Sequence, residues 1–453
     1  MSSGWRLTTV EEIAAPRPAA MATGPFGSSI SAKFFAPRGV PVIRGSNLSA
    51  EISRRLNDDG LVFVSEEKAS EFQRSIAVRG DLVFTCWGTI NQVGLVDSSS
   101  RYTRYIVSNK QMKLSVDPTK VDPLFLYYLF SGPEKQAHIL SNGIGSSVPG
   151  FNLGQLKKHE LLLPSVPEQG QIAATLGAID DRIALLRETN ATLEAIAQAL
   201  FKSWFVDFDP VRAKQQGLPP AGMDEATAAL FPGSFEESAL GLVPKGWECT
   251  DLAELTKRFG GSIQTGPFGS QLHASDYVES GVPVVMPKDI VNRRASTESV
   301  AMIGAADADR LSRHKLQAGD IVFSRRGDVE RHALITEREV GWLCGTGCLL
   351  LRPGRQWKFP GFLSMLLDAP RARTWLVQHA VGATMPNLNT GILGSVPVVL
   401  PSPSVLSAFE ELVSSTEEQR SRNASMAETL TTLRDTLLPR LISGQLRLPV
   451  ALP

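Results

Sequence analysis

The sequence repeats itself at an offset of 242 residues, and this repeat limits how the chain can fold more than any other feature. The segment TGPFGSSISAKFFAPRGVPVIRGSNL, which begins at Thr23, aligns without a gap with TGPFGSQLHASDYVESGVPVVMPKDI, which begins at Thr265. Trp5 and Trp247 stand at the same offset, each after a glycine. Because a repeated sequence specifies a repeated structural unit, the chain is predicted to contain two copies of one module.

Shorter matches extend the repeat along each half. RGDLVFTCWG at residues 79–88 corresponds to AGDIVFSRRG at 318–327, and VPGFNLGQL at 148–156 corresponds to MPNLNTGIL at 385–393. Both copies then pass through a short apolar segment, LLLP or VVLP, into a helical segment. Each module is therefore predicted to be a globular unit followed by a helix.

Short apolar runs bounded by Gly and Pro predict short strands in each globular unit. The predicted strands are residues 40–43, 82–85 and 111–116 in the first copy and 282–285, 321–324 and 348–352 in the second. Residues 123–130 and 360–367 are predicted to be short helices. The shared TGPFGS turn is predicted to be architectural, because its glycines permit backbone conformations that other residues avoid.

Residues 172–204 carry an apolar seam with alternating steps of four and three, which is typical of a heptad helix. A second helix is predicted at 405–441, although the polar residues Thr416, Arg420 and Asn423 fall on its seam. Each helix needs a partner, so the two are predicted to pair antiparallel, with Asn190 fixing the register opposite the polar middle of the second helix. The predicted spacer and docking positions are Ile172, Leu176, Ile179, Ile183, Asn190, Leu193, Leu200, Trp204, Leu430, Leu437 and Leu441.

These observations together predict an α+β protein. Two mixed α/β domains stand in tandem repeat, separated by two long antiparallel helices that form an intramolecular coiled coil with a pseudo-two-fold axis. The predicted segments are a first domain at 1–165, the first helix at 166–209, a linker at 210–241, the second domain at 242–401, the second helix at 402–445 and a tail at 446–453.

The charge and cysteine content limit the class of protein. Lys plus Arg and Asp plus Glu are balanced at 46 each, so a nucleic-acid partner would have to be bound by local patches. Residues 1–165 are mildly basic, with 18 Lys plus Arg against 14 Asp plus Glu. Four cysteines are too few for a disulfide framework, and no apolar run has the ~18 residues of a membrane span. We expect a soluble cytoplasmic protein without a bound metal.

Catalytic motifs are absent from the sequence. It has no G-x-x-x-x-G-K-[ST] phosphate loop, no Asn-Pro-Pro-aromatic or Asp-Pro-Pro-aromatic tetrapeptide of amino-methyltransferases and no H-x-x-x-H pair. The fragment Gly143-Ile144-Gly145 lacks the third glycine of a dinucleotide loop. The chain is therefore predicted to be non-catalytic, with no cofactor of its own.

The two copies share a frame but differ in the polar residues that follow the matched strands. Arg or Lys can read guanine, Asn or Gln can read adenine, and Asp or Glu can read cytosine. A common scaffold with different polar tips would suit a protein that reads two different short sequences, although solvated loops would also carry such residues. The candidate DNA-binding residues are Arg44, Ser46, Asn47, Trp87, Thr89, Asn91, Gln92, Lys110, Lys288, Asp289, Ser324, Arg325, Arg326, Asp328, Asn387 and Asn389.

The chain resembles the specificity subunit of a type I restriction-modification enzyme over essentially its whole length. The resemblance rests on the two TGPFGS segments, GDLVF and GDIVF, MPNLNTGIL and VVLP, and on the central stretches ALFKSWFVDFDPVRAK and ALFPGSFEESALGLVPKGWE. The first copy departs from the pattern, with VPGFN in place of MPNLN and Cys86-Trp87 where the second has Arg325-Arg326. These departures bear on individual contacts rather than on the family.

This resemblance implies a non-catalytic DNA reader. Each domain would be a target-recognition domain for one half of a split, asymmetric target in double-stranded DNA, and the helices would set the spacer between the halves. Two modification (methyltransferase) subunits would bring S-adenosylmethionine, and restriction (translocase and nuclease) subunits would bring ATP and magnesium. The alternatives are a protein-interaction scaffold and a nuclease that acts alone.

Overall fold

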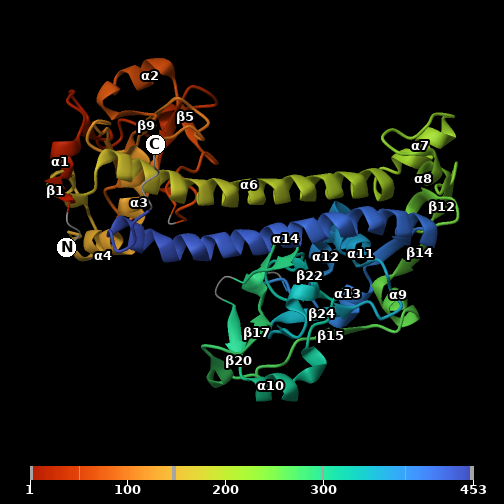
Figure 1. Cartoon of the computed structure of the whole chain (residues 1–453). Coiled ribbons are helices and arrows are strands. Elements are labelled where there is room, and N and C mark those ends of the chain that lie inside the picture. Colours follow the sequence, from red (N-terminus) through yellow and green to blue (C-terminus); the bar gives the residue numbers. More distant parts are fainter. Residues whose placement is uncertain (1–3, 50, 145–148, 298–299, 383, 449–453) are drawn as a thin grey trace. The chain divides into compact units, whose positions relative to one another are not determined.

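The computed structural model describes residues 4–49, 51–144, 149–297, 300–382 and 384–448. The predicted correspondence at Val148 lies outside the described residues. The chain divides into two compact units, which we call the first unit (residues 1–190 with 422–453) and the second unit (residues 191–421). Each unit combines one globular domain with part of both long helices (Figure 1).

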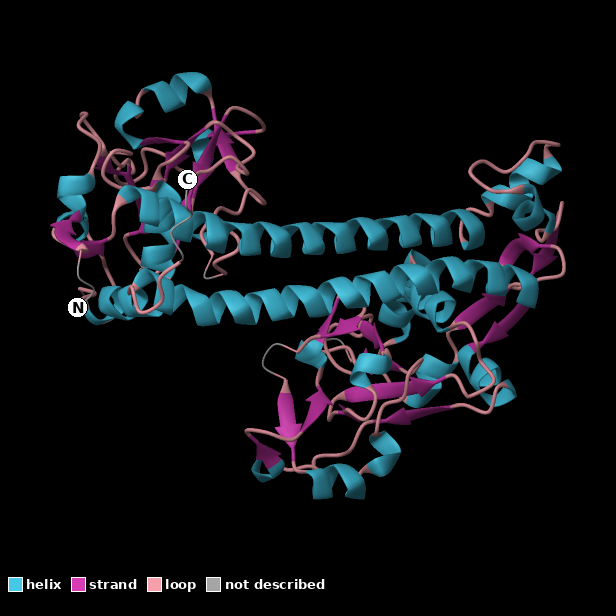
Figure 2. Ribbon diagram, in the orientation of Figure 1, coloured by secondary structure: helices cyan, strands magenta, loops and turns pink. Residues whose placement is uncertain are grey.

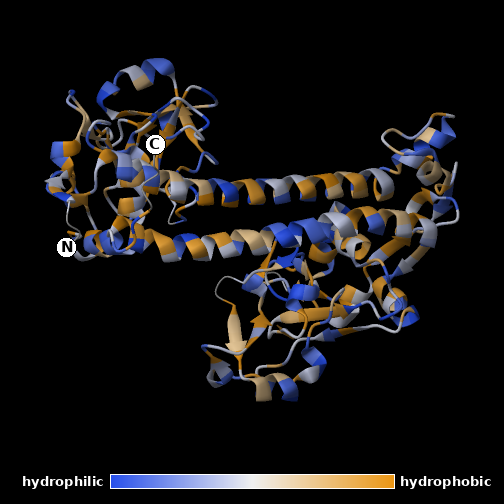
Figure 3. Cartoon of the chain, in the orientation of Figure 1, coloured by the Kyte–Doolittle hydropathy of each residue, from blue (hydrophilic) through white to orange (hydrophobic). Residues whose placement is uncertain are grey.

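The two long helices each have 40 residues, α6 at Val166–Phe205 and α14 at Pro403–Ile442. Pro167 fits in the first turn of α6, where its missing N–H would have had no helical partner. Phe208 follows α6 in the left-handed conformation, at φ 56°, and Pro210 lies in the first turn of the next helix, α7 (Asp209–Gln215), where proline fits. Hydrophobic and hydrophilic residues alternate along both helices (Figure 3), as the predicted seams require.

The α6 and α14 segments pair antiparallel within each unit. In the first unit, Asp180 contacts Arg434 at 2.9 Å and Asn190 accepts a hydrogen bond from Asn423 at 2.9 Å. In the second unit, Glu194 is paired with Arg420 and the ring of Trp204 lies 5.8 Å from that of Phe409. The predicted antiparallel partnership is confirmed in each unit, and so is the pairing of Asn190 with the polar middle of the second helix.

The globular part of the first unit consists of small sheets that the helices cover (Figure 2). A five-stranded sheet has the order β3-β5-β4-β9-β6, a four-stranded sheet has the order β2-β10-β7-β8, and β1 pairs with β11. The strands are β1 Arg6–Thr9, β2 Met21–Thr23, β3 Phe35–Ala36, β4 Val40–Ile43, β5 Val62–Val64, β6 Ile76–Val78, β7 Leu82–Thr85, β8 Val93–Leu95, β9 Arg104–Val107, β10 Gln111–Leu114 and β11 Glu160–Leu163. The helices are α1 Val10–Ile13, α2 Glu66–Ser70, α3 Pro123–Ser131, α4 Pro133–Ser141 and α5 Leu153–Lys157.

The second unit repeats this arrangement with small changes. Its sheet β15-β24-β21-β22 corresponds to β2-β10-β7-β8, and the sheet β16-β20-β17-β23 corresponds to the five-stranded sheet without its last strand. The strands are β12 Phe235–Ser238, β13 Gly241–Pro244, β14 Glu248–Asp251, β15 Ser262–Thr265, β16 Tyr277–Val278, β17 Val282–Val285, β18 Ile290–Val291, β19 Arg294–Ala295, β20 Ala301–Ile303, β21 Ile321–Ser324, β22 His332–Leu334, β23 Leu343–Cys344, β24 Cys348–Arg352 and β25 Pro397–Leu400. The helices are α7 Asp209–Gln215, α8 Glu225–Ala229, α9 Leu252–Arg258, α10 Ala305–Arg310, α11 Pro360–Asp368, α12 Pro370–His379 and α13 Thr390–Gly394.

Each unit has a large apolar core to which both long helices contribute. In the first unit, Ile172 of α6 and Leu441 of α14 are buried around α3, whose residues from Phe125 to Phe130 are all buried. In the second unit, Phe201 and Phe409 pack around α11. Burying a side chain of this size stabilises a fold by about 1.5–3 kcal/mol, so the helix pair is part of each core.

The boundaries of the compact units differ from the predicted domains, because they cut both helices between 190 and 191 and between 421 and 422. The segment at 210–241, predicted to be a partly ordered linker, contains regular secondary structure. It forms α7, α8 and the hairpin of β12 and β13, and it buries Val211 and Phe231 in the core of the second unit. The linker is therefore an integral part of that unit.

Candidate nucleic-acid interface

Loops that are distant in the sequence meet at one end of the first unit, around the turn at residues 108–110. This turn, which we call the hub turn, joins β9 to β10. The N–H of Ser108 donates to the carbonyl of Ile43 at the end of β4 (3.0 Å), and the N–H of Cys86 donates to the carbonyl of Lys110 (2.7 Å). The loops that follow β4 and β7 therefore begin beside each other.

The TGPFGS turn after β2 reaches the same end. The N–H of Gly24 donates to the carbonyl of Gln111 at 2.9 Å, and the side-chain amide of Asn109 donates to the carbonyl of Gly27 at 3.4 Å. The hub turn thus holds a third loop.

A fourth segment, which precedes α5, packs on the loop after β7. The N–H of Gly88 donates to the carbonyl of Pro149 (3.1 Å), and Trp87 forms a β-bridge with Gly150. The Trp87 ring lies on this glycine, since a Cβ atom there would be 2.7 Å from Cζ3 of the ring. We call these four segments and the hub turn the loop end of the first unit.

The second unit has an equivalent loop end with the same backbone hydrogen bonds. Its hub turn is residues 345–347, between β23 and β24. Arg326 and Asn387 form the β-bridge that corresponds to that of Trp87 and Gly150. The equivalent N–H to carbonyl bonds run from Gly345 to Val285, from Arg325 to Gly347, from Gly266 to Cys348 and from Gly327 to Pro386.

Most of the predicted DNA-binding residues are brought together at these two ends. In the first unit Ser46, Trp87, Thr89 and Lys110 are exposed, and Arg44, Asn91 and Gln92 are half-buried. In the second unit Lys288, Arg326, Asp328 and Asn389 are exposed, and Arg325 and Asn387 are half-buried. Side chains that can donate to or accept from base edges therefore project from equivalent backbone positions.

Three predicted base-reading residues are buried, which corrects their assignment. Asn47 and Asp289 occupy equivalent positions, and their side-chain oxygens accept the backbone N–H of Arg44 (3.0 Å) and of Met286 (2.9 Å). The Ser324 hydroxyl, also buried, donates to the carbonyl of its neighbour Arg326 at 2.9 Å. These polar groups satisfy backbone groups inside each unit, so they shape the loops rather than face a ligand.

Asn389 also has a structural task, although it is exposed. Its side chain accepts the N–H of Ile392 at 2.8 Å and caps α13, as Asn152 caps α5 through the N–H of Gln155 at 2.9 Å. A helix cap of this kind contributes about 1 kcal/mol. The Asn that ends VPGFN in the first copy and MPNLN in the second is thus explained by the helix that it caps.

Several charged side chains of the loop ends form ion pairs or hydrogen bonds with neighbouring residues. Asp328 pairs with Arg331 at 2.5 Å, Lys288 pairs with Asp289 at 2.7 Å, and Arg44 donates to the carbonyl of Gly60 at 2.9 Å. A DNA ligand would exchange some of these contacts for its own. The Asp328–Arg331 pair is exposed on both sides, and pairs of this kind contribute only about 0–1 kcal/mol to stability, so exchanging it would cost little.

The structure adds polar residues that the sequence pattern did not single out. Asn109 and Thr346 are the central residues of the two hub turns, and Oγ1 of Thr346 is buried without a hydrogen-bond partner among the described residues. Alignment of the hub turns could have found them, because each turn lies between two matched strands.

One arginine in each unit anchors its domain to α6. The carbonyls of Arg55 and Arg293 accept the N–H of the last residue of β8 and β22, at 2.9 and 3.0 Å, so the two positions are equivalent. Arg55 pairs with Asp97 and Asp181, both at 2.8 Å. Arg293 pairs with Glu194 at 2.5 Å.

Arg293 is held in an unusual conformation. With Asn292 it forms the two-residue turn between β18 and β19, at φ 61° and 48°, where glycine or asparagine is preferred. Its Nη1 also donates to the Ser364 hydroxyl at 3.1 Å. The buried side-chain contacts explain why arginine occupies a position that disfavours a Cβ atom.

The predicted spacer and docking residues lie on the inner faces of α6 and α14. Ile172, Leu176, Ile183, Trp204 and Leu441 are buried. The others are half-buried, namely Ile179, Asn190, Leu193, Leu200, Leu430 and Leu437. These side chains are used within the units, as the predicted seams require, and a role of the helices in docking a partner subunit stays a prediction.

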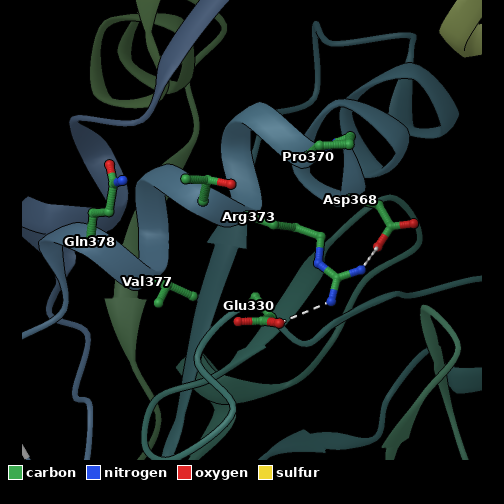
Figure 4. Close-up of a pocket in the computed structure, with 7 residues that line it drawn as sticks. Glu330, Asp368, Pro370, Arg373, Val377 and Gln378 are labelled. Atoms are coloured by element: carbon green, nitrogen blue, oxygen red, sulfur yellow. Dashed lines mark hydrogen bonds and ion pairs between the residues drawn. The ribbon is translucent and has the colours of Figure 1, made fainter.

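A pocket of about 490 Å³ lies beside α12 in the second unit (Figure 4). Arg373 points toward Glu330 at 2.9 Å and toward Asp368 at 3.9 Å. The charges that line it are already paired with one another, so the pocket offers little to a charged ligand. In the described part of the chain, no three His, Cys, Asp or Glu side chains gather as a metal site would require. Among the described helices, none combines the length and hydropathy of a membrane span.

The chain is similar to proteins of one family in sequence and in fold. Residues 31–195 match the family model of the type I restriction modification DNA specificity domain. The Type I restriction enzyme HindI specificity subunit of Haemophilus influenzae is 28% identical over 76% of this chain and 81% of its own length. The MjaIX specificity subunit of Methanocaldococcus jannaschii is 23% identical over 85% of this chain and 82% of its own length.

A solved structure has the same fold. The S subunit of a type I restriction-modification system from M. genitalium superimposes with a TM-score of 0.58 at 16% identity, covering 97% of this chain and 96% of the other. The resemblance inferred from the sequence is confirmed: residues 31–195 match the family model of the type I restriction modification DNA specificity domain, and the chain is similar, over most of its length, to type I specificity subunits.

Proposed function

We propose that this protein is the DNA specificity subunit of a type I restriction-modification complex, and that each unit binds one half of a bipartite, asymmetric target. The observation that carries the proposal is the pair of loop ends. They share one backbone frame but present different side chains, Trp87 in one and Arg326 in the other. Two domains that share one fold but recognise different DNA sequences need a common backbone frame with different side chains.

The side chains at each loop end suit direct readout in the major groove. Asn91 and Gln92 can donate to and accept from adenine, whereas Arg325 and Arg326 can bind guanine through its two acceptors. Lys110 is an exposed cation that can contact a phosphate. Lys288 is exposed and paired with Asp289 at 2.7 Å, and it would exchange part of that contact for a phosphate. The two half-sites are therefore expected to differ in base sequence.

The helices would set the spacer between the half-sites and provide docking surfaces for two modification subunits. Their seams are filled within the units, so the outward faces remain for partners. The methyltransferase chemistry with S-adenosylmethionine, and ATP-driven translocation and cleavage with magnesium, would belong to the modification and restriction subunits. This chain would contribute recognition and would bind none of these cofactors itself.

The test is a methylome of the host with and without the gene for this chain. A single bipartite motif, methylated only when the gene is present, is the expected result. The purified complex with modification subunits should then bind a duplex carrying that motif and prefer it to a scrambled duplex. Unchanged methylation, or binding without sequence preference, would refute the proposal and favour a protein-interaction scaffold. Magnesium-dependent cleavage by the chain alone would favour a nuclease.

A further inference from the structure

The TGPFGS turn is identical in both units, whereas the loops beside it differ. The first half of the turn has an architectural explanation. Gly24 and Gly266 are buried, and a Cβ atom on them would lie 1.9 Å from the carbonyl oxygen of Ser108 and 2.1 Å from that of Gly345. Only glycine permits the turn to approach the hub turn so closely.

The second half of the turn is not explained in this way. The Phe-Gly-Ser portion is exposed in both units, and the rings of Phe26 and Phe268 are 81% and 51% exposed. Neither ring belongs to the buried clusters of the described residues. Two equivalent large apolar side chains thus project into solvent from a repeated turn.

The position of the rings points to a ligand. Gly24 and Cys86 both donate to the strand or turn at residues 108–111, so Phe26 follows a loop that is fixed beside the one carrying Trp87. Gly266 and Arg325 are held in the same way at residues 345–348. Each phenylalanine therefore stands at the loop end to which the proposed function assigns base reading.

The chemistry of the turn favours bases over phosphates. TGPFGS carries no charge, so it cannot form an ion pair with a phosphate group, and the phenylalanine ring has no polar group to offer a phosphate. A flat apolar ring can stack on a base or enter a base step, and every base offers such a face whatever the sequence. Identity in both units suits a contact that is independent of sequence, while the differing loops suit half-sites that differ.

We propose that Phe26 and Phe268 are sequence-independent stacking residues, one for each half-site, that insert against the bases bordering the half-site. The inference rests on the proposed function. It extends that function by separating residues that discriminate sequence from residues that add affinity to any bound sequence.

The experiment uses the complex of the full chain with its modification subunits and a duplex with the motif found in the methylome. 2-Aminopurine is placed at the steps that border each half-site. The variants are Phe26→Ala, Phe268→Ala and the conservative Phe26→Trp. Leu218→Ala is the matched control, because Leu218 is also an exposed apolar residue, at 56%, but lies outside the loop ends.

Each alanine variant is expected to raise Kd by roughly 5- to 100-fold, as the loss of one stacked base would. The 2-aminopurine signal should return to that of free duplex at one half-site only, a different one for each variant. The methylated motif and assembly with modification subunits should stay unchanged, and Phe26→Trp should retain binding. Leu218→Ala should behave as the wild type.

The outcomes separate the inference from the function on which it rests. If the wild-type complex binds its motif but the alanine variants keep its Kd and fluorescence, the stacking role is wrong and the specificity function stands. If the variants lose modification subunits in gel filtration, the rings dock protein, and the stacking role is again wrong. If the wild-type complex shows no preference for the motif, the proposed function itself fails.

Discussion

The loop ends of the two units have the same backbone hydrogen bonds but differ in one pair of residues in direct contact. In the first unit the Trp87 ring covers Gly150, where a Cβ atom would be 2.7 Å from the ring. In the second unit Arg326 and Asn387 occupy these positions, and Asn387 carries the Cβ atom for which the tryptophan ring leaves no room at Gly150. The departure from the MPNLN pattern in the first copy is therefore coupled to its tryptophan.

This comparison shows where the module tolerates change. Backbone hydrogen bonds around each hub turn are kept, and so are the capping side chains of Asn47 and Asp289, because losing them would leave buried polar groups without partners. Exposed side chains of the loops such as Trp87 and Arg326 do not satisfy buried polar groups, so replacing them leaves no such group without a partner. The frame can thus be constant while the surface varies.

The largest expected effect comes from exchanging residues 1–165 for a recognition domain of another specificity subunit. One half of the methylated motif should change and the other should remain, with the preference for the new half-site on the order of 10³-fold or more. The donor domain should carry an arginine at the position of Arg55, since this side chain ties the domain to Asp181 of α6. Methylome sequencing reads the result, and a change in both halves would contradict independent reading by the two units.

The arginine anchors should differ in strength. Arg293→Met should destabilise the second unit by on the order of 3 kcal/mol, because it leaves Glu194 and Ser364 with fewer partners in a buried site. Arg55→Met should cost about 1–2 kcal/mol, because water can solvate Asp181, which is 69% exposed, and because Asp97, which is 14% exposed, still accepts the N–H and the hydroxyl of Ser99.

Methionine is the appropriate replacement for both anchors because it keeps much of the side-chain volume and has a Cβ atom like arginine. Hydrogen exchange during chemical denaturation reports each unit separately. Equal losses in the two units would show that exposure of the acidic partner does not set the strength of the anchor.

The acid sensitivity of the second unit should depend on His332, whose counterpart in the first unit is Val93. Burial lowers the pKa of His332 to about 3, and the nearby Arg293 acts in the same direction. The unfolded state, with an ordinary histidine pKa of about 6.5, binds a proton that the folded state excludes. Stability is therefore lost as the pH falls below about 6.5, by roughly 2 kcal/mol at pH 5.

His332→Val should remove this contribution and reduce the difference in unfolding free energy between pH 7 and pH 5. The difference should not vanish, because burial also lowers the pKa of His314, in the same unit, to about 4. Urea denaturation at the two pH values measures it. If the variant keeps the wild-type difference in unfolding free energy between the two pH values, His332 does not cause that difference, and it would take up its proton in the folded state.

The smallest expected effect concerns the helix seam in the first unit. Asn190→Leu removes the 2.9 Å hydrogen bond from Asn423, which is 6% exposed, and should destabilise the unit by about 1 kcal/mol. If this pair fixes the register, the spacer between methylated half-sites should also become less uniform. Thermal unfolding and the methylome measure the two effects, and an unaltered spacer would leave Asn190 as an ordinary polar residue of the seam.

Much of the fold could be predicted because the signals are local. Five of the six predicted strands, among them β4, β7 and β21, have the predicted bounds, and the sixth, β10, ends two residues early. The long helices, Val166–Phe205 and Pro403–Ile442, extend beyond the predicted seams at all four ends, and Pro167 and Pro403 fit in their first turns. Apolar periodicity and the positions of proline carry this information without reference to the rest of the chain.

The candidate site was predictable only in outline. The repeat identified which loops correspond. By residue type, however, Asn47, Asp289 and Ser324 could read bases, and the structure shows that they are buried. Whether a polar side chain faces a neighbouring N–H or solvent depends on the local backbone path, which composition does not specify. The core contacts of the 210–241 segment could not be predicted for a similar reason, since Val211 and Phe231 become core residues only through long-range packing.

The sequence alone determined that two copies of one module exist, that each is followed by a long helix, and that the two copies differ at the residues following matched strands. The tertiary structure decided which of these residues reach the surface, that Arg55 and Arg293 lock each domain to α6, and that the shared phenylalanines remain in solvent beside the loops that differ. Periodicity and repetition are properties of the chain itself. Exposure and pairing are not, because they depend on which distant residues fill the space around each side chain.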